Sequence, residues 1–357
     1  MDVVTFLLVF LFLSLIILFH EAGHFLVAKW NGVRVDEFGF GYPPRLFAGK
    51  IGETVYSVNA LPFGGFVRIH GTDPARAGDA EGETGRDFNT KAVWRRSSIL
   101  LAGVAMNILL GWFLLILVFA VGYPEHLIVG ATASRSPAEV ADIREGDVIL
   151  GARYGNTALL DPIATEDFIA LVKNAGDNEL SLTLARGNNR RTISLHPRMN
   201  PPEGEGALGL ALTRIGVPST NLGGSIQNAT ETTWNILEVI AKGLYAFVTK
   251  LFVSPKIIES VAGPVGIFSI AAEAGAFGMI PLLQLMAILS LNIAVLNLLP
   301  FPALDGGRFL VVLIEKAIRR PIHQKIQNGI NTVGFIVLVG LMILVTIKDV
   351  GKIVSGG

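Results

Sequence analysis

Four apolar runs, each long enough to cross a lipid bilayer, limit what this chain can fold into. They lie at about residues 3–29, 97–122, 281–313 and 333–347. A spanning helix needs about 20 mainly apolar residues, and every backbone polar group at that depth must be paired inside the protein. Only 16% of the residues are charged, against roughly 25% in an average soluble protein. The sequence therefore predicts a mainly α-helical membrane protein with about four transmembrane helices.

Basic residues between the runs predict how the chain is oriented. The N-terminus before the first run has no Lys or Arg, whereas the loop 29–98 has ten, and the short loop after the third run adds four. Cytoplasmic loops are enriched in Lys and Arg, so we expect both loops in the cytoplasm. The N-terminus and the segment between the second and third runs are then expected on the outer face. In a bacterium with two membranes, that face is the periplasm.

The first apolar run contains a metal-binding pattern, His20-Glu21-Ala22-Gly23-His24. Residues four apart share one face of a helix, so the imidazoles of His20 and His24 can reach a single Zn²⁺. Glu21 lies about a quarter-turn away, where it can take a proton from water without binding the ion itself. An ionisable group inside a spanning helix costs roughly 2.5–3.5 kcal/mol on insertion scales, so a merely structural contact is the weaker explanation.

A catalytic zinc site needs a third protein ligand, and Asp305 is the strongest candidate. It lies in the stretch NLLPFPALDGGRFL, residues 297–310, where Pro300 and Pro302 are expected to break the helix. Irregular backbone at membrane depth is tolerated where it lines a cavity. Taken alone, Asp305 could equally be a helix cap at the cytoplasmic interface. Its pairing with the zinc pattern favours the metal ligand.

The depth of Asp305 depends on the stretch TTWNILEVIAKGLYAFVTKLFV, residues 232–253. A further transmembrane helix there would bring Asp305 out on the opposite face, about a membrane thickness from the histidines. Four charged residues in and beside this stretch fall within roughly a third of the helix circumference, a pattern typical of interfacial helices. These residues are Glu231, Glu238, Lys242 and Lys250. We therefore expect the stretch to lie on the outer membrane surface, which leaves Asp305 and the histidines at the same depth.

The outer segment, residues 123–213, is expected to form a separate α+β domain. A helix should begin at Ser136-Pro137-Ala138, and residues 143–149 predict a turn that enters a strand. Residues 179–198 alternate apolar and polar side chains around Arg-Gly-Asn-Asn-Arg, which predicts a hairpin. The segment resembles a PDZ domain, a fold that binds extended peptides by adding a strand to a sheet edge. The alternative is a spacer domain that binds nothing in particular.

At this point the chain resembles the site-2 protease family of intramembrane zinc metalloproteases, in particular the bacterial group typified by the regulator of sigma-E protease. The resemblance rests on FHEAGHFLVAKW and NLLPFPALDGGRFL. It is supported, in order along the chain, by FGFGYPPRLF, LPFGGFVRIHG, FNTKAVWRRSSILLAGVAMNILLG and GPVGI. It implies that His20, His24 and Asp305 bind Zn²⁺, that Glu21 is the catalytic base and that Asn297 holds the substrate strand. Residues 103–107 read GVAMN, where the family usually has Gly-Pro before the asparagine. The change removes a kink and leaves the metal ligands intact.

The resemblance also implies the partners and the location. The substrate would be a single-pass transmembrane protein, either an anti-sigma factor or a remnant signal peptide, in the bacterial inner membrane. The active site would lie near the cytoplasmic side, where β-hairpins predicted from the aromatic–polar alternation of residues 37–71 would line the substrate's path. One PDZ-like domain fits the outer segment, where several relatives have two. It would contact substrate ends or exclude large substrates by size.

These expectations divide the chain into four parts. Residues 1–122 hold the first two transmembrane helices, the zinc motif and the β-hairpin loop, and residues 123–213 form the PDZ-like domain. Residues 214–280 contain the interfacial amphipathic helix, and residues 281–357 hold the last two transmembrane helices with the Leu-Asp-Gly motif. The lipid bilayer is an expected partner, whereas a formal net charge of zero gives no reason to expect nucleic acid.

Two other functions remain open from the sequence. The first is a non-catalytic membrane scaffold whose PDZ-like domain does the binding. The presence of Glu21 counts against it, because a structural metal site needs no base. The second is an ion transporter in which His20, His24 and Asp305 form a relay. The peptide-binding domain counts against the transporter.

Overall fold

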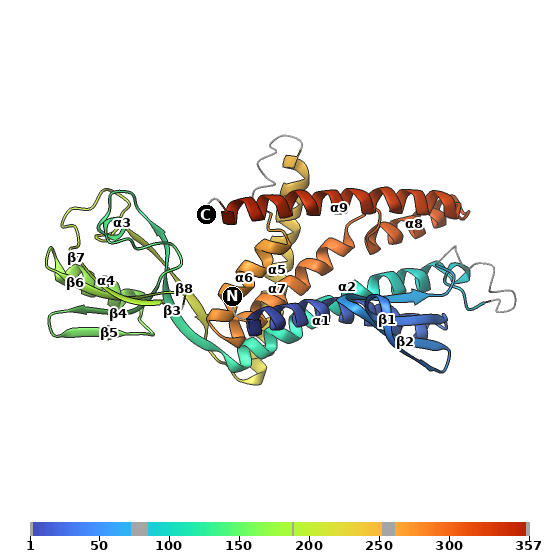
Figure 1. The fold of residues 1–357 in the computed structure, drawn as a ribbon, viewed down its shortest axis with the longest axis horizontal. Helices are drawn as coiled ribbons and strands as arrows, with labels where there is room; N and C mark the ends of the chain where they lie inside the picture. The colour runs from blue at the N-terminus through green and yellow to red at the C-terminus, as the bar shows by residue number, and fades with distance from the viewer. Residues whose placement is uncertain (1–2, 73–84, 188, 252–260, 355–357) are drawn as a thin grey trace. The chain divides into compact units, whose positions relative to one another are not determined.

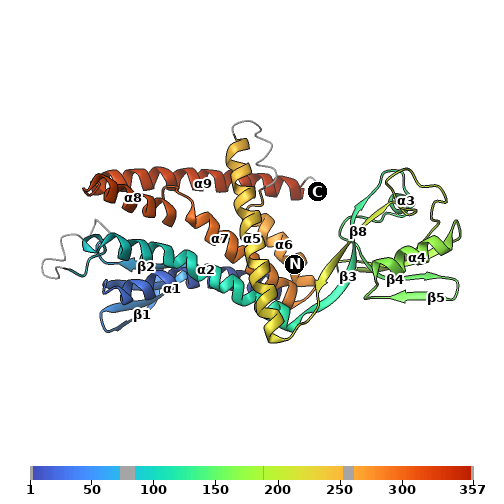
Figure 2. The ribbon, with the colours of Figure 1, turned by 180° about the vertical axis from the view of Figure 1, so that it is seen from behind.

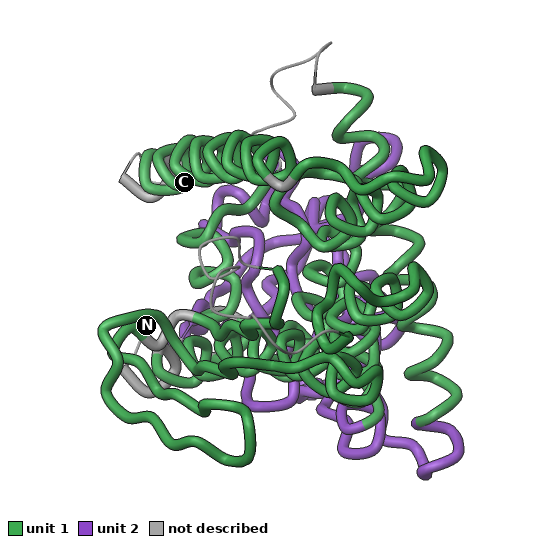
Figure 3. The backbone as a smooth tube through the Cα atoms, turned by 90° about the vertical axis from the view of Figure 1, so that its right-hand side faces the viewer, with its two compact units in different colours: residues 1–116, 226–275, 282–357 green, residues 117–225, 276–281 purple. Residues whose placement is uncertain are grey.

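The computed structural model describes residues 3–72, 85–187, 189–251 and 261–354. The chain divides into two compact units (Figure 3). Unit 1 comprises residues 1–116, 226–275 and 282–357, and unit 2 comprises residues 117–225 and 276–281.

Four helices in the described part of the chain are long and apolar enough to cross a membrane. They are α1 (Val3–Trp30), α2 (Val93–Val121), α7 (Met279–Leu298) and α9 (Gln324–Val354), seen in Figure 1. Their number agrees with the expectation from the apolar runs. The third run, 281–313, is not one helix, because α7 ends at Leu298 and a separate helix, α8 (Asp305–Ile318), follows the two prolines.

Helices α1 and α2 pack in close contact through glycine. An added Cβ on Gly23 of α1 would lie 2.4 Å from the backbone oxygen of Ala102 on α2. No side chain fits there, so the zinc-pattern face of α1 lies directly against α2. The first turn of α2 is tied to α8 by an ion pair between Arg96 and Glu315, 2.8 Å apart and almost fully buried.

A two-stranded antiparallel sheet lies beside α1, formed by β1 (Val35–Ile51) and β2 (Thr54–Ile69) (Figure 1, Figure 2). Its presence confirms the predicted hairpin. Within it, the buried carboxylate of Glu37 pairs with Arg45 at 2.6 Å and Arg68 at 2.9 Å. A buried carboxylate is stable only when its oxygens are paired in this way. The short 3₁₀ turn η2 (Phe88–Thr90) follows and leads into α2.

The segment between α7 and α8 is held from two sides. Gly306 of α8 packs against the end of α7, since an added Cβ would lie 2.3 Å from the backbone oxygens of Leu298 and Leu299. From the other side, Asn331 of α9 accepts a hydrogen bond from the backbone N–H of Ala303 at 3.3 Å. The position of Asp305, the first residue of α8, is fixed by these contacts.

Two more helices belong mainly to unit 1. The amphipathic stretch predicted at 232–253 is part of a longer helix, α5 (Leu222–Leu251), and its last two predicted residues lie outside the described ones. Helix α5 is not among the four candidate spans found in the described residues. Helix α6 (Pro264–Ala276) is capped from a distance: Asp349 of α9 accepts hydrogen bonds from the backbone N–H groups of Gly263 (2.9 Å) and Gly266 (2.8 Å).

Unit 2 is built on a six-stranded antiparallel sheet with the strand order β7-β6-β4-β3-β8, and β5 pairs with β4. Its strands are β3 (Tyr123–Thr132), β4 (Val148–Tyr154), β5 (Thr157–Leu160), β6 (Leu180–Arg186), β7 (Asn189–Leu195) and β8 (Leu210–Val217). Two helices, α3 (Pro137–Val140) and α4 (Thr165–Ala175), complete it. The alternating residues of β6 are buried in a core shared with Phe168 of α4.

Two local predictions for unit 2 are confirmed. Ser136 caps α3 by accepting a hydrogen bond from the backbone N–H of Glu139. The predicted hairpin is the pair β6 and β7. Both features could be predicted from the sequence because capping and hairpin signals act over a few neighbouring residues.

Candidate metal centre

Three ligand atoms from distant parts of the chain converge at one point. His20 and His24 lie one turn apart on α1, and Asp305 begins α8. The Nε2 atoms of the two histidines are 3.2 Å apart, and the Oδ2 atom of Asp305 lies 3.0 Å from the first and 3.1 Å from the second. Both histidines are buried. The fold thus brings together the three residues that the sequence suggested as ligands.

The residues present fit a zinc ion. Tetrahedral Zn²⁺ binds nitrogen and oxygen at about 2.0–2.2 Å, which places neighbouring ligand atoms roughly 3.3 Å from one another. The three separations here are within a few tenths of an ångström of that value. Two imidazoles and one carboxylate also form a donor set typical of catalytic zinc, with one position left for water or substrate.

Helix α2 provides room for this cluster at Gly103. An added Cβ there would lie 2.5 Å from Nε2 of His24 and 2.6 Å from Cε1 of His20. Any larger residue would occupy space that the imidazoles use. The sequence pattern does not indicate Gly103, because its role depends on how two helices pack.

The protonation of His24 is fixed by the backbone. Its Nδ1 lies 2.8 Å from the carbonyl oxygen of Ile99, which can only accept a hydrogen bond. The proton of the neutral ring must therefore be on Nδ1, and Nε2 presents a lone pair towards Asp305 and His20. Hydrogen bonds of this kind orient metal-binding histidines and select their tautomer.

Glu21 lies next to the cluster and does not belong to it. Its Oε2 accepts a hydrogen bond from the backbone N–H of Val67 on β2, at 3.0 Å. The three converging ligand atoms come from the other residues, so Glu21 is left available for proton transfer. The hairpin therefore holds the carboxylate in position beside the candidate metal site.

Glu21, His24 and Asp305 line a cavity of about 300 Å³ within unit 1. Backbone and side chains of β2 form one wall, at Gly65, Phe66 and Val67. A polar wall is formed by residues of α2, α8 and α9, namely Arg96, Arg308, Gln327, Asn328 and Asn331. This cavity contacts both the candidate base and two of the three candidate ligands, as a reaction site must.

Two asparagines differ in their relation to the candidate site. Asn297 lies in the last turn of α7, half-buried, and is not among the described residues that line the cavity. Asn107 on α2, which is not among the site residues predicted from the sequence, is fully buried, and its Nδ2 lies 3.4 Å from Nδ1 of His20. The signal was available, because a carboxamide inside an apolar run needs a polar partner.

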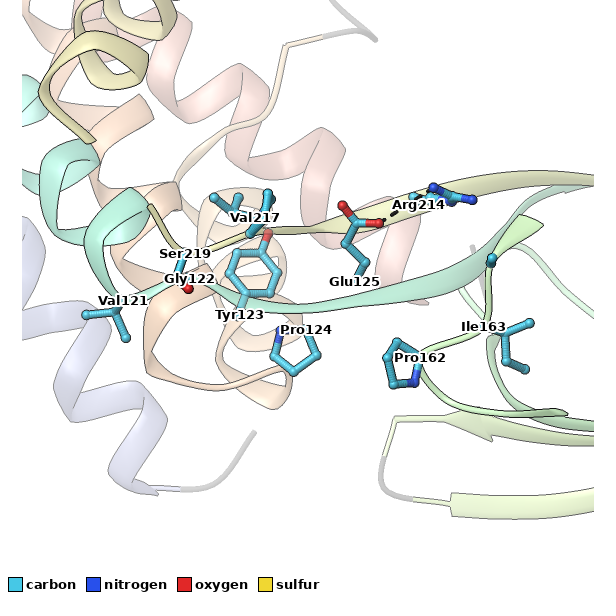
Figure 4. A pocket seen from close by; sticks show the side chains of 12 residues that line it. Val121, Gly122, Tyr123, Pro124, Glu125, Pro162, Ile163, Arg214, Val217 and Ser219 are labelled. Carbon is cyan, nitrogen blue, oxygen red and sulfur yellow. Dashed lines mark ion pairs between the residues drawn. The ribbon is translucent and has the colours of Figure 1, made fainter. Parts of the chain in front are cut away.

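A larger hollow lies within unit 2, with a volume of about 620 Å³. In Figure 4, Tyr123 and Pro124 at the start of β3 line one side of this hollow, and Pro162 lines another side. Its charged groups Glu125 and Arg214 form an ion pair, 3.7 Å apart. The hollow holds none of the candidate ligands, so its size does not make it the reaction site.

Comparisons with known proteins support this interpretation of the site. The model of peptidase family M50 matches residues 8–341. A Clostridium perfringens protein named as a candidate zinc metalloprotease is 38% identical over 338 residues, covering 94% of this chain and 96% of that protein. A similarly named protein of Fusobacterium nucleatum is 32% identical, covering 98% of this chain and 99% of its own. The regulator of sigma-W protease RasP of Bacillus subtilis is 26% identical, covering 98% of each chain.

Proposed function

The chain belongs to peptidase family M50, the site-2 protease family, and on that premise we propose that His20, His24 and Asp305 hold its zinc ion. The enzyme is an intramembrane zinc metalloprotease. The observation that carries the assignment of ligands is the convergence of three ligand atoms from residues 20, 24 and 305 to within 4.8 Å of one another.

Glu21 is proposed as the catalytic base. When bound, Zn²⁺ supplies Lewis acidity that polarises the scissile carbonyl and makes water acidic enough to lose a proton near neutral pH. The Glu21 carboxylate accepts that proton and later delivers it to the leaving amine. The hydrogen bond from Val67 holds one carboxylate oxygen in place, while the other can accept the proton.

The substrate must reach this site as an extended strand. A peptide bond inside a helix has its backbone groups hydrogen-bonded and shielded, so the substrate helix has to unwind near the cavity. Strand β2 forms one wall of that cavity, which supports a role for the hairpin in guiding the strand. Asn297 is proposed to hold the strand, supported by its place just before the irregular segment that leads to Asp305.

The proposed substrate is a single-pass transmembrane protein. An anti-sigma factor is favoured, because the Bacillus subtilis relative is named as a regulator of sigma-W protease. Remnant signal peptides are the second candidate class.

The proposed location is the bacterial inner membrane, with the N-terminus on the periplasmic side and the active site near the cytoplasm. The support is the density of Lys and Arg in the loop 29–98.

Residues 123–213 are proposed to be a single periplasmic PDZ-like domain that contacts substrate ends or filters substrates by size. The antiparallel sheet and two helices of this segment support a PDZ-like fold. The rest of the chain is proposed to form three parts. The first two transmembrane helices with the zinc motif lie in residues 1–122, the amphipathic helix in residues 214–280, and the last two transmembrane helices in residues 281–357.

The test is the zinc content of the Asp305→Ala protein, measured together with cleavage of a transmembrane substrate. We expect reduced occupancy and no cleavage, with helicity by circular dichroism unchanged. Asp305 lies in the first turn of α8, after the N-cap residue Leu304, so if it only stabilised the helix terminus its loss would cost about 0.3–1 kcal/mol of stability, with zinc and activity kept. Full zinc occupancy would remove Asp305 from the site.

A further inference from the structure

Asn107 is a fully buried polar residue in the apolar helix α2, and its side chain contacts a candidate metal ligand. Its Nδ2 lies 3.4 Å from Nδ1 of His20, while its Oδ1 is buried without a hydrogen-bond partner among the described residues. Its backbone oxygen accepts a hydrogen bond from the hydroxyl of Ser290 on α7, at 2.8 Å. The backbone oxygen of Asn107 is thus paired, while half of its side-chain amide is not.

The amide orientation determines which nitrogen of His20 carries the proton. A neutral imidazole has one N–H, and binding a metal through Nε2 requires that proton to be on Nδ1. With Nδ2 of Asn107 facing His20, the amide donates to Nδ1, and the ring proton must sit on Nε2. That proton then points at Asp305 Oδ2, 3.0 Å away, which suits the metal-free site.

A half-turn of the amide gives the opposite arrangement. The oxygen and nitrogen of a carboxamide exchange places, so Oδ1 comes to the position that faces Nδ1 of His20. Oδ1 accepts the Nδ1 proton there, and Nε2 presents its lone pair. His24 obtains the same tautomer from the carbonyl oxygen of Ile99, which cannot donate.

We propose that Asn107 is a positioning residue that sets the tautomer of His20, with its Oδ1 accepting the Nδ1 proton of His20 when zinc is bound. This inference rests on the proposed zinc role of His20. The carboxamide can serve both states of the site, since it donates to the metal-free tautomer and accepts from the metal-binding one. Outer partners of metal-binding histidines are typically responsible for 10–100-fold in metal affinity.

The test is the zinc affinity of the full-length chain in detergent, measured by chelator competition. Asn107→Leu keeps the approximate shape and removes the acceptor, so it should weaken zinc binding roughly 10–100-fold. Asn107→Asp keeps an acceptor oxygen and should bind zinc at least as well as the wild type. Ser290→Ala is the control, because it removes a buried hydrogen bond between α7 and the backbone of Asn107 and leaves the side-chain amide unchanged, so it should not alter zinc affinity.

Each outcome decides between a tautomer role and a packing role. Wild-type affinity in Asn107→Leu would overturn the proposal, as would equal losses in all three variants. Should Asn107→Leu fail to fold, Asn107→Asp still decides. If the Asn107→Asp protein binds zinc more weakly than the wild type, Asn107 acts as a donor and the proposal fails. Unchanged or tighter zinc binding by this variant supports the acceptor role. Nitrogen-15 histidine NMR of the zinc-loaded wild type gives a second readout, with the His20 proton expected on Nδ1. If His20→Ala leaves zinc binding intact, the proposed ligand set fails instead.

Discussion

Gly103 of α2 lies so close to His24 of α1 that a Cβ on the glycine would be 2.5 Å from the Nε2 atom of the imidazole. Substitution of Gly103 by Ala should therefore displace both histidines and lower zinc affinity and cleavage together. Gly340→Ala in α9 is the control, because an added Cβ there meets nothing within 4 Å. The control should bind zinc normally. Equal zinc affinity in the two variants would show that the imidazoles do not need the space at Gly103.

The proposed base can be separated from the proposed ligands. Glu21→Gln removes a carboxylate that lies beside the cluster and is not part of it, and glutamine can still accept the hydrogen bond from Val67. Zinc content should stay near that of the wild type, while cleavage of a transmembrane substrate should fall by at least the 10²–10⁴-fold typical of general acid–base catalysis. The measurement is zinc per protein alongside initial cleavage rate. Cleavage near the wild-type rate would exclude Glu21 as the base.

Membrane orientation can be tested by thiol labelling, since the chain has no native cysteine. Asp177 and Lys316 are both exposed, in unit 2 and at the end of α8. An impermeant thiol reagent added to intact spheroplasts should modify the Asp177→Cys protein and leave the Lys316→Cys protein unmodified until the membrane is opened. The reverse labelling pattern would show that the orientation predicted from the Lys and Arg residues of the loops is wrong.

Unit 2 should lose stability in acid through two aspartates. The guanidinium groups of Arg144 and Arg186 lower the pKa of Asp142 from 3.8 to about 2. Burial acts to raise the pKa of Asp147, but the Arg186 guanidinium and the Arg144 backbone N–H outweigh it and hold that pKa below its usual range. A carboxylate with a lowered pKa stabilises the fold above its ordinary pKa, and this contribution is lost as the pH falls through the folded value.

Amide hydrogen exchange in strands β4 and β6 of the full chain, followed from pH 5 to pH 2, measures this loss. Protection should decline mainly below about pH 4, where the ordinary pKa of Asp lies. Arg186→Met removes one of the two arginines that pair with both aspartates, the other being Arg191. Protection of the strands in this variant should therefore already be lower at pH 5 and depend less on pH. A decline as steep as that of the wild type would show that Arg186 does not mediate the effect.

The sequence predicts what depends on local geometry and misses what depends on packing. His20 and His24 could be paired because four residues make about one helical turn, and Ser136 because a cap acts on its own helix. Asp305 needed an argument about chemistry, since no local rule connects residues 24 and 305. Gly103 could not be found at all, because its small size matters only once α2 lies against α1. The break in the third apolar run could also be predicted, because Pro300 and Pro302 cannot continue a regular helix, and α7 ends at Leu298 just before them.

Helix α9 holds the segment that carries Asp305, the carboxylate of the candidate metal site. Asn331 accepts the Ala303 N–H, and Gly334 lies so close that an added Cβ would be 2.5 Å from Cβ of Pro302. During synthesis the two histidines enter the membrane first, some 300 residues before α9. A nascent chain that has not yet inserted α9 therefore has the zinc pattern without a fixed third ligand. We therefore expect peptide-bond cleavage only after α9 has inserted, so that the order of synthesis delays the activity of the proposed site.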